Sequence, residues 1–217
     1  MRALLTSSLL FAVRPRAPLR CQIPISMAAT DPPPADVPKF IMSANAATKW
    51  LVVAAQTSAV VVRRDVIAPY IVVGSIGSAF VCKKLKKAFN QQRPAGAPFT
   101  DPGMPSSHAL VATFAAAAWA LHQRQYAATA AAAALWPPLL LAGAAIVALL
   151  RVATGYHTWA QIGVGSGLGV VGATAWMGAG HALLARRALS PLAVWAAYLG
   201  GSFIFITKAM AKWSWRS

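Results

Sequence analysis

Three short segments of this 217-residue chain carry polar side chains whose types and spacing suit chemistry on an anion. The first runs from Lys86 to Pro94 and reads KKAFNQQRP. Lys86 and Arg93 are seven residues apart, about two helical turns, so both side chains can project from one helix face. Pro94 disfavours helix at Arg93, which allows the guanidinium to turn into a pocket. The segment can therefore place two cations around one anion.

The second segment, residues 101–108, reads DPGMPSSH and directly precedes an apolar stretch. Ser106 and Ser107 are natural N-cap residues, and the free backbone N–H groups at a helix start bind oxyanions. His108 stands at the same expected helix end. This segment therefore combines an anion-binding helix terminus with a side chain that can transfer protons.

In the third segment Arg151 precedes His157 by six residues, and Gln161 follows one helical turn later. Together the segments offer lysine, arginine, serine and histidine side chains, a set that suits displacement at a phosphate dianion. Arginine binds phosphate oxygens bidentately, and lysine adds a mobile point charge. One histidine can attack phosphorus while the other protonates the departing oxygen.

Each segment alone also has a structural explanation. Residues 83–87 fit a basic run that orients a membrane protein, and Arg151 fits a flank of the same kind. Gln161 fits a hydrogen bond within a helix bundle. His122 and His181 fall on the opposite side of the expected spans, and we interpret them as structural. The coincidence of three patterns at three span ends favours a functional site.

The composition indicates a protein that lies largely in lipid. Hydrophobic residues make up 58% of the chain and charged residues only 11%, whereas about a quarter of the residues in soluble domains are charged. The net charge is +16, yet long stretches carry no charge at all. Four acids and two cysteines cannot build a two-metal centre, a zinc site or a disulfide framework. We therefore expect no metal, no cofactor and no nucleic-acid partner.

Six apolar stretches have about the length that a bilayer-crossing helix requires. They cover about residues 48–62, 66–82, 107–121, 126–150, 158–180 and 189–207. The expected fold is therefore all-α, an integral membrane bundle of about six transmembrane helices. Small residues allow close helix packing in lipid, and we expect the pairs Gly163/Gly167 and Gly165/Gly169 to form a packing face.

Alternation of six spans places the three polar segments on one side of the membrane. That side also collects most of the lysines and arginines, which orients it toward the cytosol or stroma by the positive-inside rule. The tail after Lys208 carries Trp213 and Trp215 among its cations, which is typical of an interfacial anchor.

The N-terminal part differs in composition from the rest. Residues 1–30 contain four arginines, three serines and no acid, which is typical of an organelle transit peptide; a disordered cytosolic tail is the alternative. Residues 31–38 are rich in proline and predict an extended linker. We therefore divide the chain into a transit peptide with linker, residues 1–38, and a membrane domain, residues 39–217. We expect a plastid membrane, with the endoplasmic reticulum as the alternative.

The three segments resemble the signature motifs of the type 2 phosphatidic acid phosphatase superfamily, K-x6-R-P, P-S-x-H and R-x5-H. The motifs stand in the same order here, and the resemblance covers about residues 50–207. It implies that His157 is the nucleophile that forms a phosphohistidine and that His108 is the general acid. It also implies that the phosphate is held, without a metal ion, by Lys86, Arg93, Ser106, Ser107 and Arg151.

Three positions depart from the usual motif residues. Ser107 stands where the superfamily usually has glycine, Leu150 where it has serine, and Gln161 where it has aspartate. A glutamine carbonyl can orient the His157 imidazole but adds no negative charge. The strings GMPSSH and HTWAQ resemble plastid-type lipid phosphate phosphatases and dolichyl-diphosphate phosphatases, two branches in which glutamine is the normal residue. The longer string NQQRP…DPGMPSSHA, with the expected transit peptide, favours the plastid branch.

These features predict a membrane lipid phosphatase that converts phosphatidate to diacylglycerol and inorganic phosphate. A dolichyl or polyprenyl diphosphate phosphatase with the same site residues is the first alternative. A non-catalytic membrane scaffold that retains a phosphate-binding pocket is the second. A vanadium haloperoxidase fits poorly, because nothing in the chain supplies a soluble scaffold. The sequence indicates no particular oligomeric state.

Overall fold

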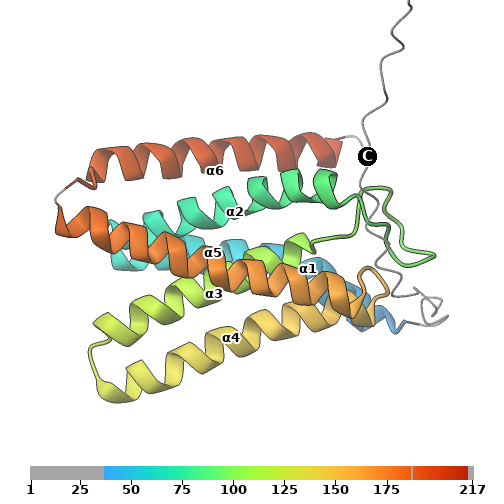
Figure 1. Cartoon of the computed structure of the whole chain (residues 1–217), viewed down its shortest axis with the longest axis horizontal. Coiled ribbons are helices and arrows are strands. Elements are labelled where there is room, and N and C mark those ends of the chain that lie inside the picture. Colours follow the sequence, from blue (N-terminus) through green and yellow to red (C-terminus); the bar gives the residue numbers. More distant parts are fainter. Residues whose placement is uncertain (1–36, 187, 215–217) are drawn as a thin grey trace, which may run out of the picture.

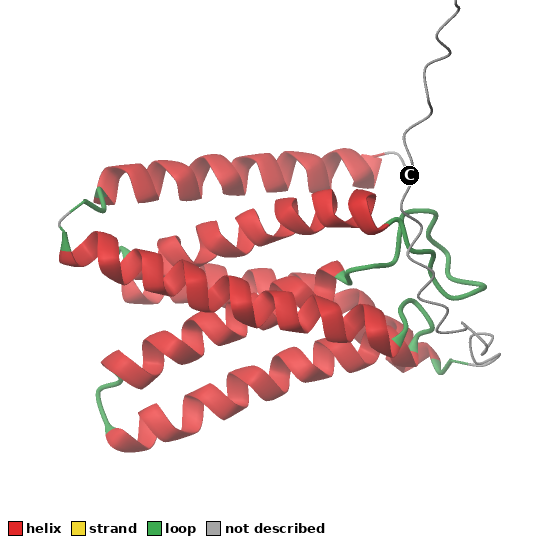
Figure 2. Cartoon of the chain, in the orientation of Figure 1, coloured by secondary structure: helices red, strands yellow, loops and turns green. Residues whose placement is uncertain are grey.

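The structure, a computed structural model, is a bundle of helices and describes residues 37–186 and 188–214. Six helices follow one another with no strand in this part of the chain (Figures 1 and 2). They are α1 (Lys39–Arg63), α2 (Ile67–Phe89), α3 (Ser107–Tyr126), α4 (Ala130–Ala153), α5 (Trp159–Ala185) and α6 (Pro191–Ser214). The predicted all-α fold is confirmed. The helices are mostly longer than the apolar stretches, because polar turns extend them at their ends.

Helix α2 ends before the first arginine of the polar segments. Asn90 caps α2 in the left-handed conformation, with φ 45°, and its N–H donates to the Lys86 carbonyl. Asparagine tolerates this conformation better than most residues, so the helix stops there. Arg93 consequently lies in the loop beyond α2, and the prediction that it shares a helix face with Lys86 is wrong. Pro94 disfavours helix at Arg93, and the loop that contains both residues brings the Arg93 guanidinium to the other two segments.

Helix α3 lies inside the bundle and packs against α2, α4 and α5. Two glycines of α5 allow the close approach. A Cβ atom at Gly165 would lie 2.8 Å from the Ser106 carbonyl oxygen, and one at Gly169 would lie 2.6 Å from the Leu110 carbonyl oxygen. The predicted packing face is therefore confirmed for this pair. It is wrong for Gly163 and Gly167, where a Cβ atom would meet no described atom within 4 Å.

Four of the described helices are long and apolar enough to cross a membrane: α2, α4, α5 and the Pro191–Lys208 part of α6. Large apolar side chains such as Leu192, Phe203 and Val171 are exposed on the outside of the bundle, as lipid contact requires. Helix α3 is not among the four. It is enclosed by other helices, so alanines that permit close packing serve it better than large lipid-facing side chains.

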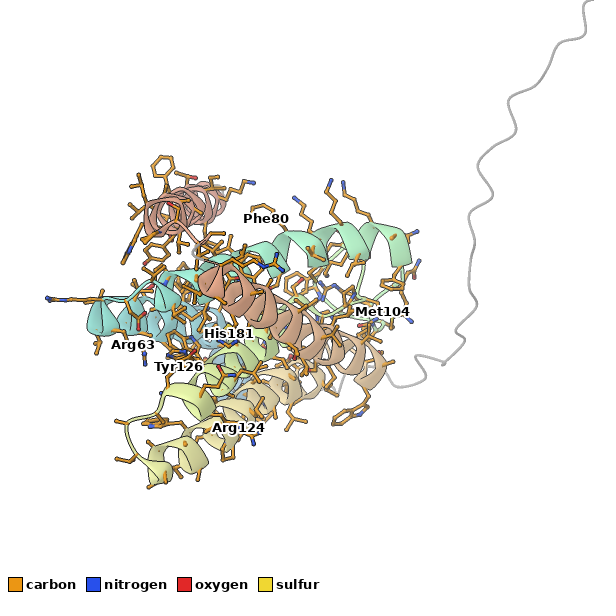
Figure 3. All side chains as sticks on the ribbon, turned by 60° about the vertical axis from the view of Figure 1, so that its left-hand side comes forward. Arg63, Phe80, Met104, Arg124, Tyr126 and His181 are labelled. Carbon is orange, nitrogen blue, oxygen red and sulfur yellow. The ribbon has the colours of Figure 1, made fainter. Side chains whose placement is uncertain are left out.

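The loops that carry the polar segments lie at one end of the bundle (Figures 1 and 2). The loop between α2 and α3 and the loop between α4 and α5 meet there, beside the start of α1. Arg63, Tyr126 and His181 lie at the opposite end, away from Met104 (Figure 3). The topology predicted by alternating spans is thus confirmed for the three segments. The expected transit peptide lies outside the described residues.

Candidate active site

His157 lies at the centre of the polar end of the bundle, in the loop between α4 and α5. Its side chain is buried, and both ring nitrogens are hydrogen-bonded. Nδ1 lies 3.0 Å from Gln161 Oε1. Nε2 lies 3.0 Å from Nη1 of Arg93. The structure therefore brings Arg93 of the first segment and Gln161 of the third to the two ring nitrogens of one imidazole.

Gln161 determines which ring nitrogen of His157 carries the proton. A capping box with Thr158 places Gln161 in the first turn of α5, directly beside the imidazole. Its Nε2 donates to the carbonyl oxygen of Gln92 at 2.8 Å, and a carbonyl oxygen can only accept. Oε1 must then face His157 and accept from Nδ1–H. Nε2 of His157 then carries a lone pair, which accepts the hydrogen bond from Arg93 Nη1.

The surroundings of His157 favour the neutral imidazole. Burial, followed by the positive charges of Arg93 and Arg151, lowers the pKa of His157 from its ordinary value of 6.5 to about 3. The hydrogen bond with Gln161 opposes this shift only in part. At neutral pH Nε2 therefore carries a lone pair rather than a proton, as a nucleophile requires.

Lys86 and Arg93 meet through a carboxylate to which the sequence analysis gave no role. Lys86 Nζ donates to Asp101 Oδ2 at 2.7 Å and to the Pro102 carbonyl. Arg93 Nη2 donates to both carboxylate oxygens of Asp101, at 3.0 and 2.9 Å. Burial alone would raise the pKa of Asp101, but these hydrogen bonds outweigh burial and lower it, so the group is ionised at neutral pH. The scarcity of acids in the chain was the signal that could have identified it.

Arg151 reaches the site from the last turn of α4. Nη1 donates to Oδ1 of Asn45 in α1 at 3.1 Å, and the guanidinium lies over the Tyr156 ring. Both Arg151 and Asn45 are buried, whereas Nε of Arg151 has no hydrogen-bond partner among the described residues. Asn45 was also missed by the sequence analysis. A lone asparagine in an amphipathic stretch gives no local sign of a partner more than 100 residues away.

The two serines at the start of α3 differ in what their hydroxyls contact. Ser106 is fully buried, its N–H donates to the Gln161 carbonyl at 3.0 Å, and its Oγ has no partner in the described part of the chain. Ser107 Oγ lies 3.3 Å from Sγ of Cys82 in α2. The free hydroxyl that the sequence predicts for an anion is therefore present at Ser106, while that of Ser107 is engaged with α2.

His108 occupies the first turn of α3 on the same side of the molecule. The charges that act on it most strongly are those of Arg151, Lys49 and Arg93. Its two ring nitrogens form no hydrogen bond with residues 37–186 or 188–208. A nearby imidazole without a fixed partner is suited to exchange a proton with a substrate.

The other two histidines lie at the far end of the bundle. His122 stacks on Tyr126 with ring centroids 5.0 Å apart, and His181 lies edge-on to the same ring at 6.2 Å (Figure 3). They are well separated from the polar loops, on the opposite side that the alternation of spans predicts. In the described part of the chain, no three His, Cys, Asp or Glu side chains gather as metal ligands would.

The chain is similar in sequence to two curated plant proteins along part of its length. The chain is 33% identical over 133 residues to "Lipid phosphate phosphatase epsilon 2, chloroplastic" of Arabidopsis thaliana, covering 61% of this chain and 46% of the relative. It is 32% identical over 140 residues to "Lipid phosphate phosphatase epsilon 1, chloroplastic" of the same plant, covering 64% and 50%. The chain thus spans about half the length of these curated relatives. No solved structure matches significantly. Residues 67–185 match the PAP2 superfamily. This stretch is more than half of the chain and contains all three polar segments, so the chain belongs to that superfamily.

Proposed function

We propose that this protein is a membrane lipid phosphate phosphatase that acts on phosphatidate through a phosphohistidine formed on His157. The observation that carries the proposal is the fixed tautomer of His157, with the Nε2 lone pair held beside Lys86, Arg93 and Arg151. Membership of the PAP2 superfamily and the printed names of the two chloroplastic relatives support a phosphatase that acts on lipid phosphates.

The first chemical step forms one bond and breaks another. Nε2 of His157 attacks phosphorus while the bond between phosphorus and the lipid oxygen breaks, and His108 donates a proton to the departing oxygen. Neutral His108 then takes a proton from water, which attacks the phosphohistidine and releases inorganic phosphate. The hydrogen bond between Arg93 Nη1 and His157 Nε2 must first break, because it occupies the lone pair that attacks phosphorus. A phosphate oxygen offers that N–H a stronger, charged acceptor.

Two polar atoms fit the role of holding the phosphate. Ser106 Oγ and Arg151 Nε are buried without a hydrogen-bond partner among the described residues. Leaving such groups unpaired costs about 1–3 kcal/mol each, more for a charged group. Phosphate oxygens would satisfy both atoms. Ser107 contributes to the proposed site through its position in the first turn of α3 rather than through its hydroxyl, which lies against Cys82.

Phosphatidate suits a site at one end of an apolar bundle, because its phosphate lies at the membrane interface while its acyl chains stay in lipid. We place the protein in a plastid membrane, as the chloroplastic relatives favour, with residues 1–38 as transit peptide and linker. Imaging a fluorescent fusion tests this location. Labelling of the endoplasmic reticulum instead would contradict it.

The central experiment measures phosphate release and phosphoenzyme formation by the purified full chain in mixed micelles. With ³²P-phosphatidate, the wild type should release phosphate and yield an acid-labile, base-stable phosphohistidine after rapid quenching. His157→Ala should yield neither. The matched control is His181→Ala, a histidine at the opposite end, which should retain both. Phosphohistidine trapped in His157→Ala would refute the assignment. Release from polyprenyl diphosphate alone would identify the diphosphatase alternative, and release from neither lipid would favour the scaffold.

A further inference from the structure

We propose that Asp101 is a specificity-determining residue that makes the site select phosphate monoesters over diphosphates. This inference rests on the proposed phosphatase function and concerns the substrate class of the same site. Asp101 acts as a fixed negative charge beside the cationic cluster, where it repels the second phosphate group of a diphosphate.

The hydrogen bonds of Arg93 divide its guanidinium between Asp101 and the reaction centre. Nε donates to the Asp101 carbonyl at 3.0 Å, and Nη2 donates to both of its carboxylate oxygens. Nη1 instead points toward His157 Nε2 and the Tyr156 carbonyl, at 3.0 and 3.1 Å. A phosphate bound for attack by His157 can therefore take Nη1 while Asp101 keeps the other two nitrogens. Asp101 need not leave during the reaction, and its charge continues to act on whatever binds.

Asp101 is the one described negative charge at this end of the bundle. The cations that act on His157 are Arg93, Arg151 and Lys86, and Lys49 acts on His108 beside them. The site is therefore cationic, and Asp101 is the one described charge in it that repels an anion. The remaining described acid, Asp65, pairs with Arg63 at the opposite end. A phosphate monoester carries a charge of about −1.5 to −2 at neutral pH. A terminal diphosphate adds a further negative charge, which the carboxylate of Asp101 repels.

The exposure of Asp101 places its charge where a second phosphate would lie. The side chains of Lys86 and Arg93 are 9% and 8% exposed, whereas that of Asp101 is 52% exposed. Asp101 therefore lies on the solvent side of the buried cations. When the terminal phosphate of a diphosphate contacts His157 and takes Nη1 of Arg93, we expect the inner phosphate to extend toward this exposed side. It would then meet the carboxylate, and like charges repel.

Coulomb's law gives the expected size of the effect. Two unit charges about 6 Å apart change an equilibrium constant roughly 3-fold at the dielectric constant of water and roughly 100-fold at an effective value of about 20. Asp101→Asn should therefore raise the activity toward a diphosphate, relative to a monophosphate, by roughly 3- to 100-fold. Asparagine keeps the size of the side chain and one acceptor oxygen for Arg93, so the change isolates the charge.

The experiment compares farnesyl phosphate with farnesyl diphosphate, which share one chain and differ by one phosphate. The ratio of kcat/KM for diphosphate to monophosphate should rise in Asp101→Asn, chiefly through a lower KM for the diphosphate. Asp101→Glu, which keeps the charge, should keep the wild-type ratio, and so should the control Asp65→Asn. An unchanged ratio in Asp101→Asn, or the same rise in Asp101→Glu, would overturn the proposal.

A binding measurement separates this inference from the proposed function. Isothermal titration of the full chain in detergent with orthophosphate and with pyrophosphate requires no turnover. Asp101→Asn should shift the affinity ratio toward pyrophosphate by the same factor. A shift without lipid hydrolysis by the wild type would support the role of Asp101 and contradict the phosphatase. Hydrolysis without any shift would support the phosphatase and contradict the role of Asp101.

Discussion

Replacing Gln161 by leucine tests whether the side-chain amide of Gln161 orients the nucleophile His157. Leucine has a similar volume but no polar atoms, so it removes both the acceptor for His157 Nδ1–H and the donor to the Gln92 carbonyl. Each buried group left unpaired costs about 1–3 kcal/mol. If the same energy biases the imidazole toward its reactive tautomer, kcat should fall roughly 5- to 150-fold, since about 1.4 kcal/mol corresponds to a factor of ten. KM should change little, because Gln161 is not expected to touch the phosphate.

The assay is steady-state hydrolysis of phosphatidate in mixed micelles, with quenched-flow measurement of phosphoenzyme formation. Thermal unfolding of the same samples shows how much of the loss reflects stability alone. Gln125→Leu is the matched control, because Gln125 is exposed near the end of α3 and should leave kcat unchanged. A Gln161→Leu protein with wild-type kcat, or one that loses activity only through KM, would refute the orienting role.

Three other predictions concern the acid, the protonation state and metal dependence. General acid catalysis contributes roughly 10²–10⁴-fold, so His108→Ala should lose about that much activity on phosphatidate. It should lose far less on p-nitrophenyl phosphate, because that leaving group needs no proton. Equal losses on the two substrates would contradict the general-acid role of His108. Because the pKa of His157 is lowered to about 3, its ¹⁵N signals, assigned by comparison with His157→Ala, should not titrate between about pH 5 and 8. A midpoint near the ordinary value of 6.5 would count against the buried, cation-flanked site. Activity should survive excess EDTA, and a loss restored only by Mg²⁺ would rule out the histidine mechanism.

Helix ends account for much of what was predictable about the site. Ser106 holds the N-cap position of α3 as its residue type predicts, although its side chain accepts no N–H there. Thr158 caps α5 through its side chain, a signal within one turn that the sequence analysis did not use. Pro94 is a similar local signal, because a proline disfavours helix at the residue before it, here Arg93. The signals at Ser106 and Pro94 and the alternation of apolar stretches predicted that the three segments lie at one end of the bundle. The position of Arg93 on a helix face was mispredicted, because an asparagine in the left-handed conformation ended α2 early.

The sequence by itself determined the all-helical fold, the six helices and the cluster of cations and histidines at one end, since these follow from hydrophobicity, helix capping and motif spacing. Only the tertiary structure decided which partners those groups take. Asn45 meets Arg151 across 106 positions of sequence, and Gln92 fixes the amide of Gln161 from another loop. Asp101 and His157 contact different nitrogens of the Arg93 guanidinium, Nη2 and Nη1. Such pairings depend on the path of loops and the depth of burial. A buried charge takes the partner that the folded backbone brings within about 3 Å, whatever their separation along the chain.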